Sequence, residues 1–196
     1  MTTPPYSWKK RGCIFTPSGR HPNLLSHAAN PLAMPLSQSI FRIFYSGRDA
    51  MKRSSVGAFD YDILSGEIIA DYEEPFISAG LPGSFYEDGI SVGNCYSAGS
   101  KTYMLFMAWR TPKNSHWYGD IGRFLVNEDL TLSIDRDTPF ISHKDFNSIS
   151  LSYPWVHPSK QGEFEMWYGT TEAWDAGNNE MLHVIRNAVS PDGETW

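Results

Sequence analysis

Cysteine is scarce in this sequence, and so are the features that mark secreted or membrane-bound proteins. The two cysteines, Cys13 and Cys95, form neither a CxxC pair nor a disulfide framework. The opening residues MTTPPYSWKK lack the apolar core of a signal peptide. The longest apolar run, residues 103–109, is far too short to span a bilayer. We therefore expect a cytoplasmic protein in a reducing setting, with no membrane partner.

Motifs for nucleotides, metals and activated serines are also missing. The sequence has no P-loop and no GxGxxG, HExxH or GxSxG pattern. The six histidines are spread along the chain without the spacing of metal ligands. These absences predict a protein with neither a cofactor nor a metal site.

Charge is unevenly distributed over the 196 residues, whose formal net charge is −6. Residues 1–56 carry eight Lys or Arg and one acid, and the remaining residues carry eight Lys or Arg and twenty-one acids. A basic segment of this kind can bind nucleic acid. The basic residues are scattered, however, and no nucleic-acid motif accompanies them, so a solvated surface is the better interpretation and no nucleic-acid partner is expected.

Aromatic and turn-forming residues are abundant. Aromatics make up 14% of the chain, which also has 16 Gly and 13 Pro. This composition favours short strands joined by turns, and no window shows a sustained period of 3.6 residues. The sequence predicts an all-β fold with little helix.

Three aromatic runs repeat at a period of about sixty residues. They are RIFYSGRD (42–49), YMLFMAWR (103–110) and FEMWYGTT (164–171), and aligning Tyr45, Met107 and Tyr168 gives steps of 62 and 61 residues. A β-sandwich would explain short strands but not this spacing. Repeats of this length indicate the blades of a β-propeller.

Each aromatic run is flanked by further strand-like segments. The preceding segments are residues 26–36, 84–96 and 148–158, and the following strand–turn–strand segments are 54–67, 118–132 and 181–196. Each unit is then a four-stranded antiparallel blade, with Trp196 beginning the outer strand of the third. We predict a single propeller domain over residues 1–196, with blades at about 26–76, 84–141 and 148–196.

Several short motifs resemble those of a known superfamily. They are HAANP (27–31), FYSGRD (44–49), FYEDGIS (85–91), MWYG (166–169) and SPDGETW (190–196). In this order and spacing they resemble the five-bladed β-propeller glycoside hydrolases of families 43, 32 and 130 and their uncharacterised relatives. The resemblance implies that about three of five blades are present. It also implies C-terminal truncation and possible self-association through the open edge of the propeller.

The resemblance implies an active site at one end of the propeller axis. Glycoside hydrolysis needs two carboxyl groups, and this superfamily typically places one acid on the first strand of each of its first three blades. On blade two, Asp88 matches the second acid and Glu87 lies beside it. An Asp-Gly turn with solvated acids is the alternative interpretation.

Blades one and three depart from that pattern. Blade one offers Asn30 where an Asp is expected, with His27 nearby as a group that titrates near neutrality. Asp49 is the other acid of that blade, and with Arg48 it forms either a loop-ordering ion pair or a clamp for sugar hydroxyls. On blade three, Ser152 and Tyr153 stand where a Glu is expected.

The loop after the third aromatic run offers two more candidates. Glu172 is its nearest acid, and Trp174 could stack on a sugar ring. Arg110 could hold a phosphate together with Arg48.

Two hypotheses follow. The first is a carbohydrate-active enzyme that acts on a glycosidic bond with a modified acid set, in which Asp88, Asp49 and Glu172 are catalytic. The second is a non-catalytic carbohydrate-binding propeller, or the propeller module of a larger sugar-modifying enzyme. A carbohydrate is the expected ligand in both.

Overall fold

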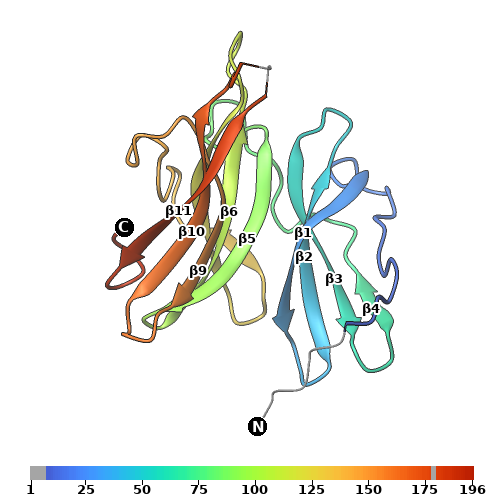
Figure 1. Ribbon diagram of the computed structural model, residues 1–196. Coiled ribbons are helices and arrows are strands. Elements are labelled where there is room, and N and C mark those ends of the chain that lie inside the picture. Colours follow the sequence, from blue (N-terminus) through green and yellow to red (C-terminus); the bar gives the residue numbers. More distant parts are fainter. Residues whose placement is uncertain (1–7, 178–179) are drawn as a thin grey trace.

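The computed structural model of the chain describes residues 8–177 and 180–196, and it confirms the all-β prediction (Figure 1). These residues form eleven strands and no helix, so none of the described residues belongs to a helix that could cross a membrane. Eight strands are linked by pairing and the other three form a separate sheet. A single parallel pair between β3 and β5 joins the two four-stranded halves of the larger set, which we call the first and second sheets.

The strands follow the chain order within each sheet. The first sheet comprises β1 (Ser26–Pro35), β2 (Ile40–Arg48), β3 (Ser54–Asp62) and β4 (Glu67–Asp71). The second comprises β5 (Gly89–Ala98), β6 (Lys101–Arg110), β7 (Tyr118–Val126) and β8 (Leu132–Ile134). The third comprises β9 (Leu151–Pro158), β10 (Phe164–Ala173) and β11 (Leu182–Ser190). Consecutive strands within each sheet pair in antiparallel fashion.

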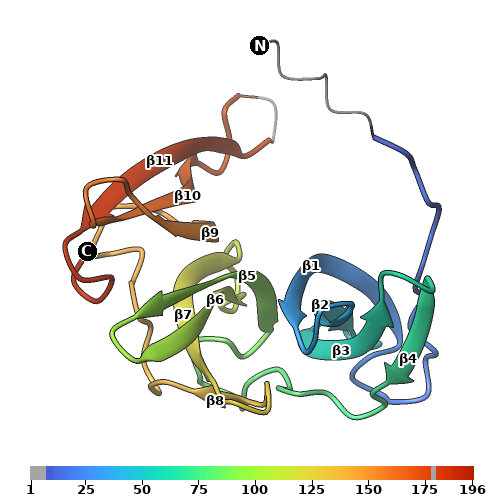
Figure 2. The same cartoon turned by 90° about the horizontal axis from the view of Figure 1, so that it is seen from below.

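The three sheets are arranged around a common axis. Figure 2 shows β1, β5 and β9 on the inner side of an arc, with β4, β8 and β11 farther out. This is the arrangement of propeller blades, in which each sheet packs one face on the next sheet. The propeller predicted from the sixty-residue repeat is confirmed.

Burial along the strands follows from this stacking. In β6, six successive residues from Tyr103 to Ala108 are buried, because the second sheet has a neighbour on each side. In β10 burial alternates instead: Met166 and Tyr168 are buried, and Trp167 between them is 45% exposed. Residues on one face of a strand recur every two positions, so β10 covers a core on one face only.

Hydrophobic clusters fill the spaces between the sheets. One contains Phe44, Ile90 and Phe106 and joins the first and second sheets. Another contains Leu105, Leu151 and Met166 and joins the second and third sheets. A smaller cluster on the first sheet is covered by the N-terminal segment, in which Phe15 stacks on Phe59 with ring centroids 4.1 Å apart.

The register of the repeat differs by one residue from the predicted alignment. In the first sheet the Tyr45 ring lies on Gly57, and an added Cβ there would collide with the ring. In the second sheet Phe106 lies on Gly122 in the same way. Phe106 is therefore the equivalent of Tyr45, and the predicted equivalence with Met107 is wrong by one position.

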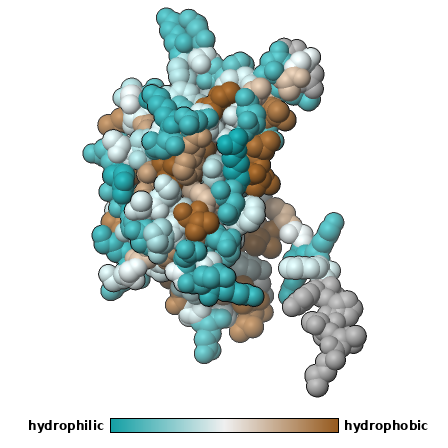
Figure 3. All heavy atoms as spheres, turned by 60° about the vertical axis from the view of Figure 1, so that its left-hand side comes forward, coloured by the Kyte–Doolittle hydropathy of each residue, from teal (hydrophilic) through white to brown (hydrophobic). Residues whose placement is uncertain are grey.

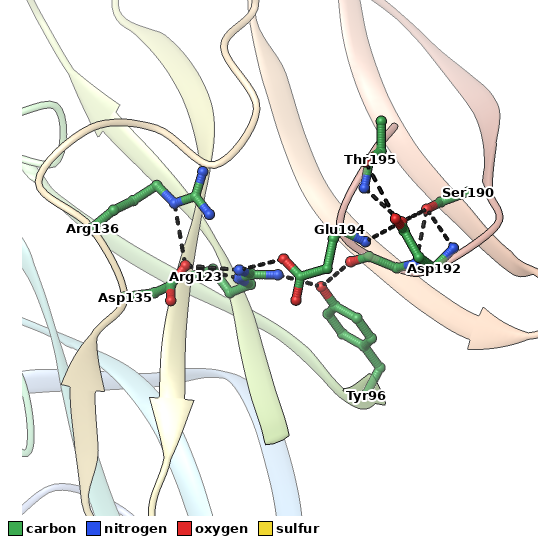
Figure 4. A network of polar contacts seen from close by, with 9 residues as sticks. Tyr96, Arg123, Asp135, Arg136, Ser190, Asp192, Glu194 and Thr195 are labelled. Atoms are coloured by element: carbon green, nitrogen blue, oxygen red, sulfur yellow. Dashed lines mark hydrogen bonds and ion pairs between the residues drawn. The ribbon is translucent and has the colours of Figure 1, made fainter. Parts of the chain in front are cut away.

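A buried arginine joins the second and third sheets (Figure 4). The Arg123 side chain is 2% exposed, and its guanidinium lies 2.9 Å from Asp135, directly after β8, and 2.8 Å from Glu194, after the third sheet. Arg123 also donates to the Tyr96 hydroxyl, which in turn donates to the Gly193 carbonyl at 2.8 Å. Burial raises the pKa of Tyr96 to about 12, so the hydroxyl stays protonated and able to donate.

The SPDGETW motif forms a turn and not the start of a strand. Asp192 Oδ1 accepts the backbone N–H groups of Glu194 and Thr195, each at 2.8 Å, and Ser190 Oγ accepts that of Gly193. Trp196 packs against the second core and lies in no strand of the described residues, so its place at the start of an outer strand stays a prediction. The motif instead positions Glu194 against Arg123.

A second buried arginine joins the first and second sheets. Arg42 pairs with Asp60 at 2.9 Å and donates to the Asp129 carbonyl, which lies in the turn between β7 and β8. The backbone also crosses this junction, where Ser54 at the start of β3 pairs in parallel with Gly89 at the start of β5. Separating the first and second sheets would break the hydrogen bond from Arg42 to the Asp129 carbonyl. Separating the second and third sheets would break the ion pair between Arg123 and Glu194 and leave a buried charge uncompensated.

The two cysteines have different surroundings. Cys13 is exposed in the N-terminal segment, whereas Cys95 on β5 is partly buried, with its Sγ 3.5 Å from Met34 Sδ. Burial raises the pKa of the Cys95 thiol to about 12.

The space-filling view in Figure 3 shows a largely hydrophilic face with hydrophobic residues along its right-hand edge.

Candidate functional site

The inner strands contain residues with left-handed backbone conformations. His27 and Asn30 on β1 have φ values of 65° and 53°, and Tyr153 on β9 has a φ of 47°. All three lie where the pairing with the neighbouring strand is shifted by a bulge. Bulges redirect side chains and are common beside functional sites, so the bulged parts of these inner strands are candidates for a site.

A hollow of about 270 Å³ lies where the three sheets meet, and we call it the axial hollow. The first sheet contributes Arg48, at the end of β2. The second and third sheets contribute the remaining lining residues, which are Ser91, Met107, Trp109, Trp117 and Tyr153. Three of the lining side chains are aromatic and none is acidic.

A smaller hollow of about 180 Å³ shares Tyr153 with the first, and we call it the Asn30 hollow. Its other lining residues are Asn30, Pro31, Val92, Gly93, Pro154 and Trp155. Asn30 lies on β1 of the first sheet and Tyr153 on β9 of the third, so two sheets contribute these side chains to the hollows. Tyr153 is 59% exposed, so its ring is available to a ligand.

Trp109 is held in place by a buried serine. Its Nε1–H donates to Ser54 Oγ at 3.0 Å, and the same oxygen accepts the Ile90 N–H at 2.9 Å. Ser54 belongs to the first sheet and is 3% exposed. The orientation of one wall of the axial hollow therefore depends on the contact between two sheets.

Trp117 continues the axial hollow into an aromatic cluster. Trp174 stacks on His116 with centroids 4.9 Å apart, and Trp117 meets its edge at 5.1 Å. Trp117 also faces His183 at 6.3 Å. The predicted sugar-stacking residue Trp174 is thus packed behind Trp117 and does not line the axial hollow.

The acids predicted on blade two are bonded to backbone groups of nearby turns. Asp88 Oδ2 accepts the N–H of Thr111 at 2.6 Å, just past the end of β6. Glu87 Oε2 accepts the N–H of Gly83 at 2.8 Å. Neither residue lines either hollow.

The other predicted acids form ion pairs. Asp49 binds Arg53 through Arg53 Nε at 2.8 Å and its backbone N–H at 2.8 Å, so its partner is not the adjacent Arg48. Glu172 pairs with Arg186 of β11 at 2.5 Å. The three predicted catalytic acids, Asp88, Asp49 and Glu172, are therefore not brought together in either hollow.

Two predicted binding residues also lie outside the hollow linings. His27 Nδ1 lies 2.9 Å from Ser26 Oγ, on the exposed surface of β1. The Arg110 guanidinium lies over the Tyr118 ring at 4.9 Å, and its Nε has no hydrogen-bond partner among the described residues. Arg110 does not line the axial hollow with Arg48. That the two arginines hold one phosphate together stays a prediction.

Four residues of the axial hollow were not predicted from the sequence: Ser91, Met107, Trp109 and Trp117. The aromatic run containing Trp109 is typical of a core strand, and its inner residues do lie in the core. Their position in the sequence could have identified the two tryptophans, because Trp109 and Trp117 flank the connection between the second and third strands of the middle blade.

A buried polar pair lies near the start of β7. Asp120 is 3% exposed and its Oδ1 accepts the N–H of His143 at 2.8 Å and contacts His143 Nδ1 at 2.7 Å. Within residues 8–177 and 180–196, no group of three or more His, Cys, Asp or Glu side chains could hold a metal ion. Because Asp120 holds both the backbone and the ring of His143, the pair orients the loop after β8.

No family model matches the chain. Two relatives from Mycobacterium tuberculosis strains, each named an uncharacterized protein, are 36% identical over 191 residues. That match covers 97% of this chain, and the chain spans 64% of those relatives' own length.

Solved structures of sugar-acting enzymes share the fold. Sucrose-6-phosphate hydrolase from Lactobacillus gasseri matches with a TM-score of 0.66 and 16% identity, over 90% of this chain and 34% of that one. Levansucrase from B. megaterium matches with a TM-score of 0.60 and 13% identity, over 94% and 56%. The β-fructofuranosidase of Bombyx mori, of glycoside hydrolase family 32, matches with a TM-score of 0.59 and 13% identity, over 92% and 37%. The chain therefore has the fold of the five-bladed β-propeller glycoside hydrolases, in the form of a partial propeller of three sheets.

Proposed function

We propose that the chain binds a carbohydrate in the axial hollow and serves as the sugar-binding propeller of a larger carbohydrate-active protein. The observation that carries the proposal is the lining of that hollow: aromatic rings and neutral polar groups from the second and third sheets, one arginine from the first, and no carboxylate. Solved structures with this fold are named for glycoside hydrolases, which supports a sugar as the ligand.

The lining suits the chemistry of a sugar ring. A pyranose or furanose has apolar C–H faces that pack on aromatic rings, and hydroxyl groups that need both donors and acceptors. Trp109, Trp117 and Tyr153 offer the rings. Arg48 donates hydrogen bonds, and the Ser91 and Tyr153 hydroxyls both donate and accept.

Binding accounts for the lining better than hydrolysis does. Hydrolysis needs one carboxyl group to protonate the leaving oxygen and another to attack the sugar or activate water. The acids predicted for these roles are engaged with Thr111, Arg53 and Arg186 instead. The hydrolase hypothesis has one observation in its favour, since Asp88 directly precedes β5, the strand that carries Ser91 into the axial hollow.

The test is a titration of the 196-residue chain with a panel of oligosaccharides. Tryptophan fluorescence measures binding, and the release of reducing sugar measures hydrolysis. Tyr153→Ala is expected to weaken sugar binding about tenfold or more, since loss of a stacked ring costs roughly 1–2 kcal/mol. Tyr153 is 59% exposed, so the variant should fold normally.

Trp167→Ala is the matched control, because Trp167 is an exposed aromatic on β10 that lines neither hollow. Its sugar affinity should equal that of the unchanged chain. Absence of binding to every oligosaccharide would refute the proposal. Release of reducing sugar would support the hydrolase hypothesis in its place.

A further inference from the structure

One arginine of the described residues lies in a hollow without a partner. Most arginines in this part of the chain form ion pairs with carboxylates, namely Arg20, Arg42, Arg53, Arg123, Arg136 and Arg186. Arg110 lies over an aromatic ring, and Arg11 is exposed in the N-terminal segment. Arg48 makes no side-chain hydrogen bond or ion pair to any described residue, yet it lines the axial hollow.

The acid next to Arg48 in the sequence does not neutralise it. Both carboxylate oxygens of Asp49 are occupied by Arg53, one by its backbone N–H and the other by its Nε. The Asp49 side chain is 9% exposed, because it closes the turn between β2 and β3. Arg53, which belongs to the same turn, pairs with Asp49, so Arg48 is left without this carboxylate as a partner.

The walls of the axial hollow leave that charge uncompensated. The other lining residues are a serine, a methionine, two tryptophans and a tyrosine, none of which is anionic at neutral pH. Arg48 is exposed at the end of β2, so a ligand in the axial hollow can reach its guanidinium. Guanidinium groups bind carboxylates and phosphates through two parallel hydrogen bonds, a geometry that a neutral hydroxyl cannot reproduce.

We propose that the axial hollow takes an anionic sugar, whose phosphate or carboxylate pairs with Arg48 while its ring lies against the aromatic walls. This inference rests on the proposed carbohydrate-binding function and specifies its substrate class. Arg48 is the specificity-determining residue, because it is the charged member of the lining.

The experiment compares matched pairs of sugars that differ in charge. Galacturonate against galactose tests a carboxylate, and glucose 6-phosphate against glucose tests a phosphate. Each is titrated into the chain by calorimetry at low salt. We expect the charged member of at least one pair to bind about tenfold tighter or more, since hydrogen bonds to charged groups exceed neutral ones by about that factor. The pair that shows the preference identifies the anionic group.

Three variants make the assignment specific. Arg48→Gln should abolish the preference while changing the affinity for the neutral sugar by less than about threefold, because the stacking surface is unchanged. Arg48→Lys keeps the charge but loses the planar fork, so it should keep part of the preference. Arg11→Gln removes the same charge at a distant, exposed position and should change nothing.

The outcomes separate this inference from the proposed function. Equal binding of charged and neutral sugars, or a preference that survives Arg48→Gln, overturns the anionic-sugar inference and leaves carbohydrate binding intact. Absence of binding by all four sugars and by the oligosaccharide panel refutes both. A preference that disappears only in Arg48→Gln supports the inference.

Discussion

Tyr153 combines a strained backbone with an exposed side chain. A non-glycine residue at positive φ costs about 1–3 kcal/mol when its surroundings impose it. The side chain of Tyr153 is 59% exposed, so burial offsets little of that cost. Backbone strain that burial of the side chain does not offset indicates a functional role for the residue. Tyr153 lines both the axial hollow and the Asn30 hollow.

Replacing Tyr153 by glycine should therefore separate stability from binding. Glycine adopts positive φ freely, which relieves about 1–2 kcal/mol of strain, and its extra freedom in the unfolded chain takes back about 0.5–1 kcal/mol. We expect Tyr153→Gly to melt at the same temperature as the unchanged chain or slightly higher, and to lose sugar affinity. Thermal unfolding followed by circular dichroism measures the first effect.

Tyr153→Ala is the comparison for that experiment, because alanine loses the ring and keeps the strain. It should melt at a lower temperature than Tyr153→Gly. If alanine proved the more stable of the two, the left-handed conformation at this position would not be strained.

Residue pairing was the part of the site that sequence reasoning could not resolve. Arg48 and Asp49 are adjacent, and adjacency made an ion pair between them a reasonable hypothesis. The turn instead brings Arg53 onto Asp49, because residues four apart across this turn come face to face. Turn geometry decides which arginine pairs with Asp49, and neither the composition nor the spacing of the sequence reveals that geometry.

At the scale of elements, the strands could be predicted and their irregularities could not. Aromatic runs bounded by turn residues located strands such as β2, β6 and β10 to within a few residues. Glu87 and Asp88 lie in the bend before β5, which begins at Gly89. The bulges that place Asn30 and Tyr153 arise from pairing between strands, which no local pattern encodes.

The turn of residues 190–196 shows how a short polar motif can join two sheets. Asp192 holds the backbone N–H groups of Glu194 and Thr195, and these hydrogen bonds lower its pKa to about 2. The turn in this conformation presents Glu194 to Arg123. Ionised Asp192 is therefore part of the junction between the second and third sheets, although its own carboxylate is at the surface.

Asp192 predicts a specific loss of stability in acid. Its folded pKa of about 2 lies below the ordinary value of 3.8, so its contribution is present above pH 4 and is lost as pH falls toward 2. We expect Asp192→Asn to lower the melting temperature at pH 7, and to show a smaller further decline between pH 4 and pH 2 than the unchanged chain. Differential scanning calorimetry across this range measures both.

Asp137→Asn supplies the control for the acid series, since Asp137 is an exposed loop aspartate. Its profile should follow that of the unchanged chain. Identical pH profiles for all three proteins would mean that Asp192 does not contribute to the junction.

At the scale of the molecule, the third sheet has an apolar face that no other described element covers. Trp155 and Trp167 lie opposite each other on neighbouring strands and are 56% and 45% exposed. Ile185 and Val189 on β11 lie on the same face and are 76% and 51% exposed. Surfaces of this kind bind another surface or associate with themselves, and we expect two copies of the chain to associate through it at high concentration.

An acidic substitution on this face should therefore reduce association. Ile185→Asp places a charge where the apolar contact would form, and the position is exposed enough for the fold to tolerate it. Sedimentation velocity over a hundredfold range of concentration should show a shift toward monomer. Leu64→Asp, at a residue that is 83% exposed in the turn between β3 and β4, should have no such effect. A chain that stays monomeric throughout, or an equal effect of both substitutions, would contradict the expectation.

The contrast between the two thiols makes the chain easy to label at one place. Thiolates react with maleimide dyes, and a thiol with a pKa of about 12 supplies almost no thiolate near neutrality. Cys13 is exposed and Cys95 is not. A dye would thus attach in the N-terminal segment, two residues before the Phe15 ring that stacks on Phe59. Its fluorescence would report whether that segment stays seated on the first sheet when sugar enters the axial hollow.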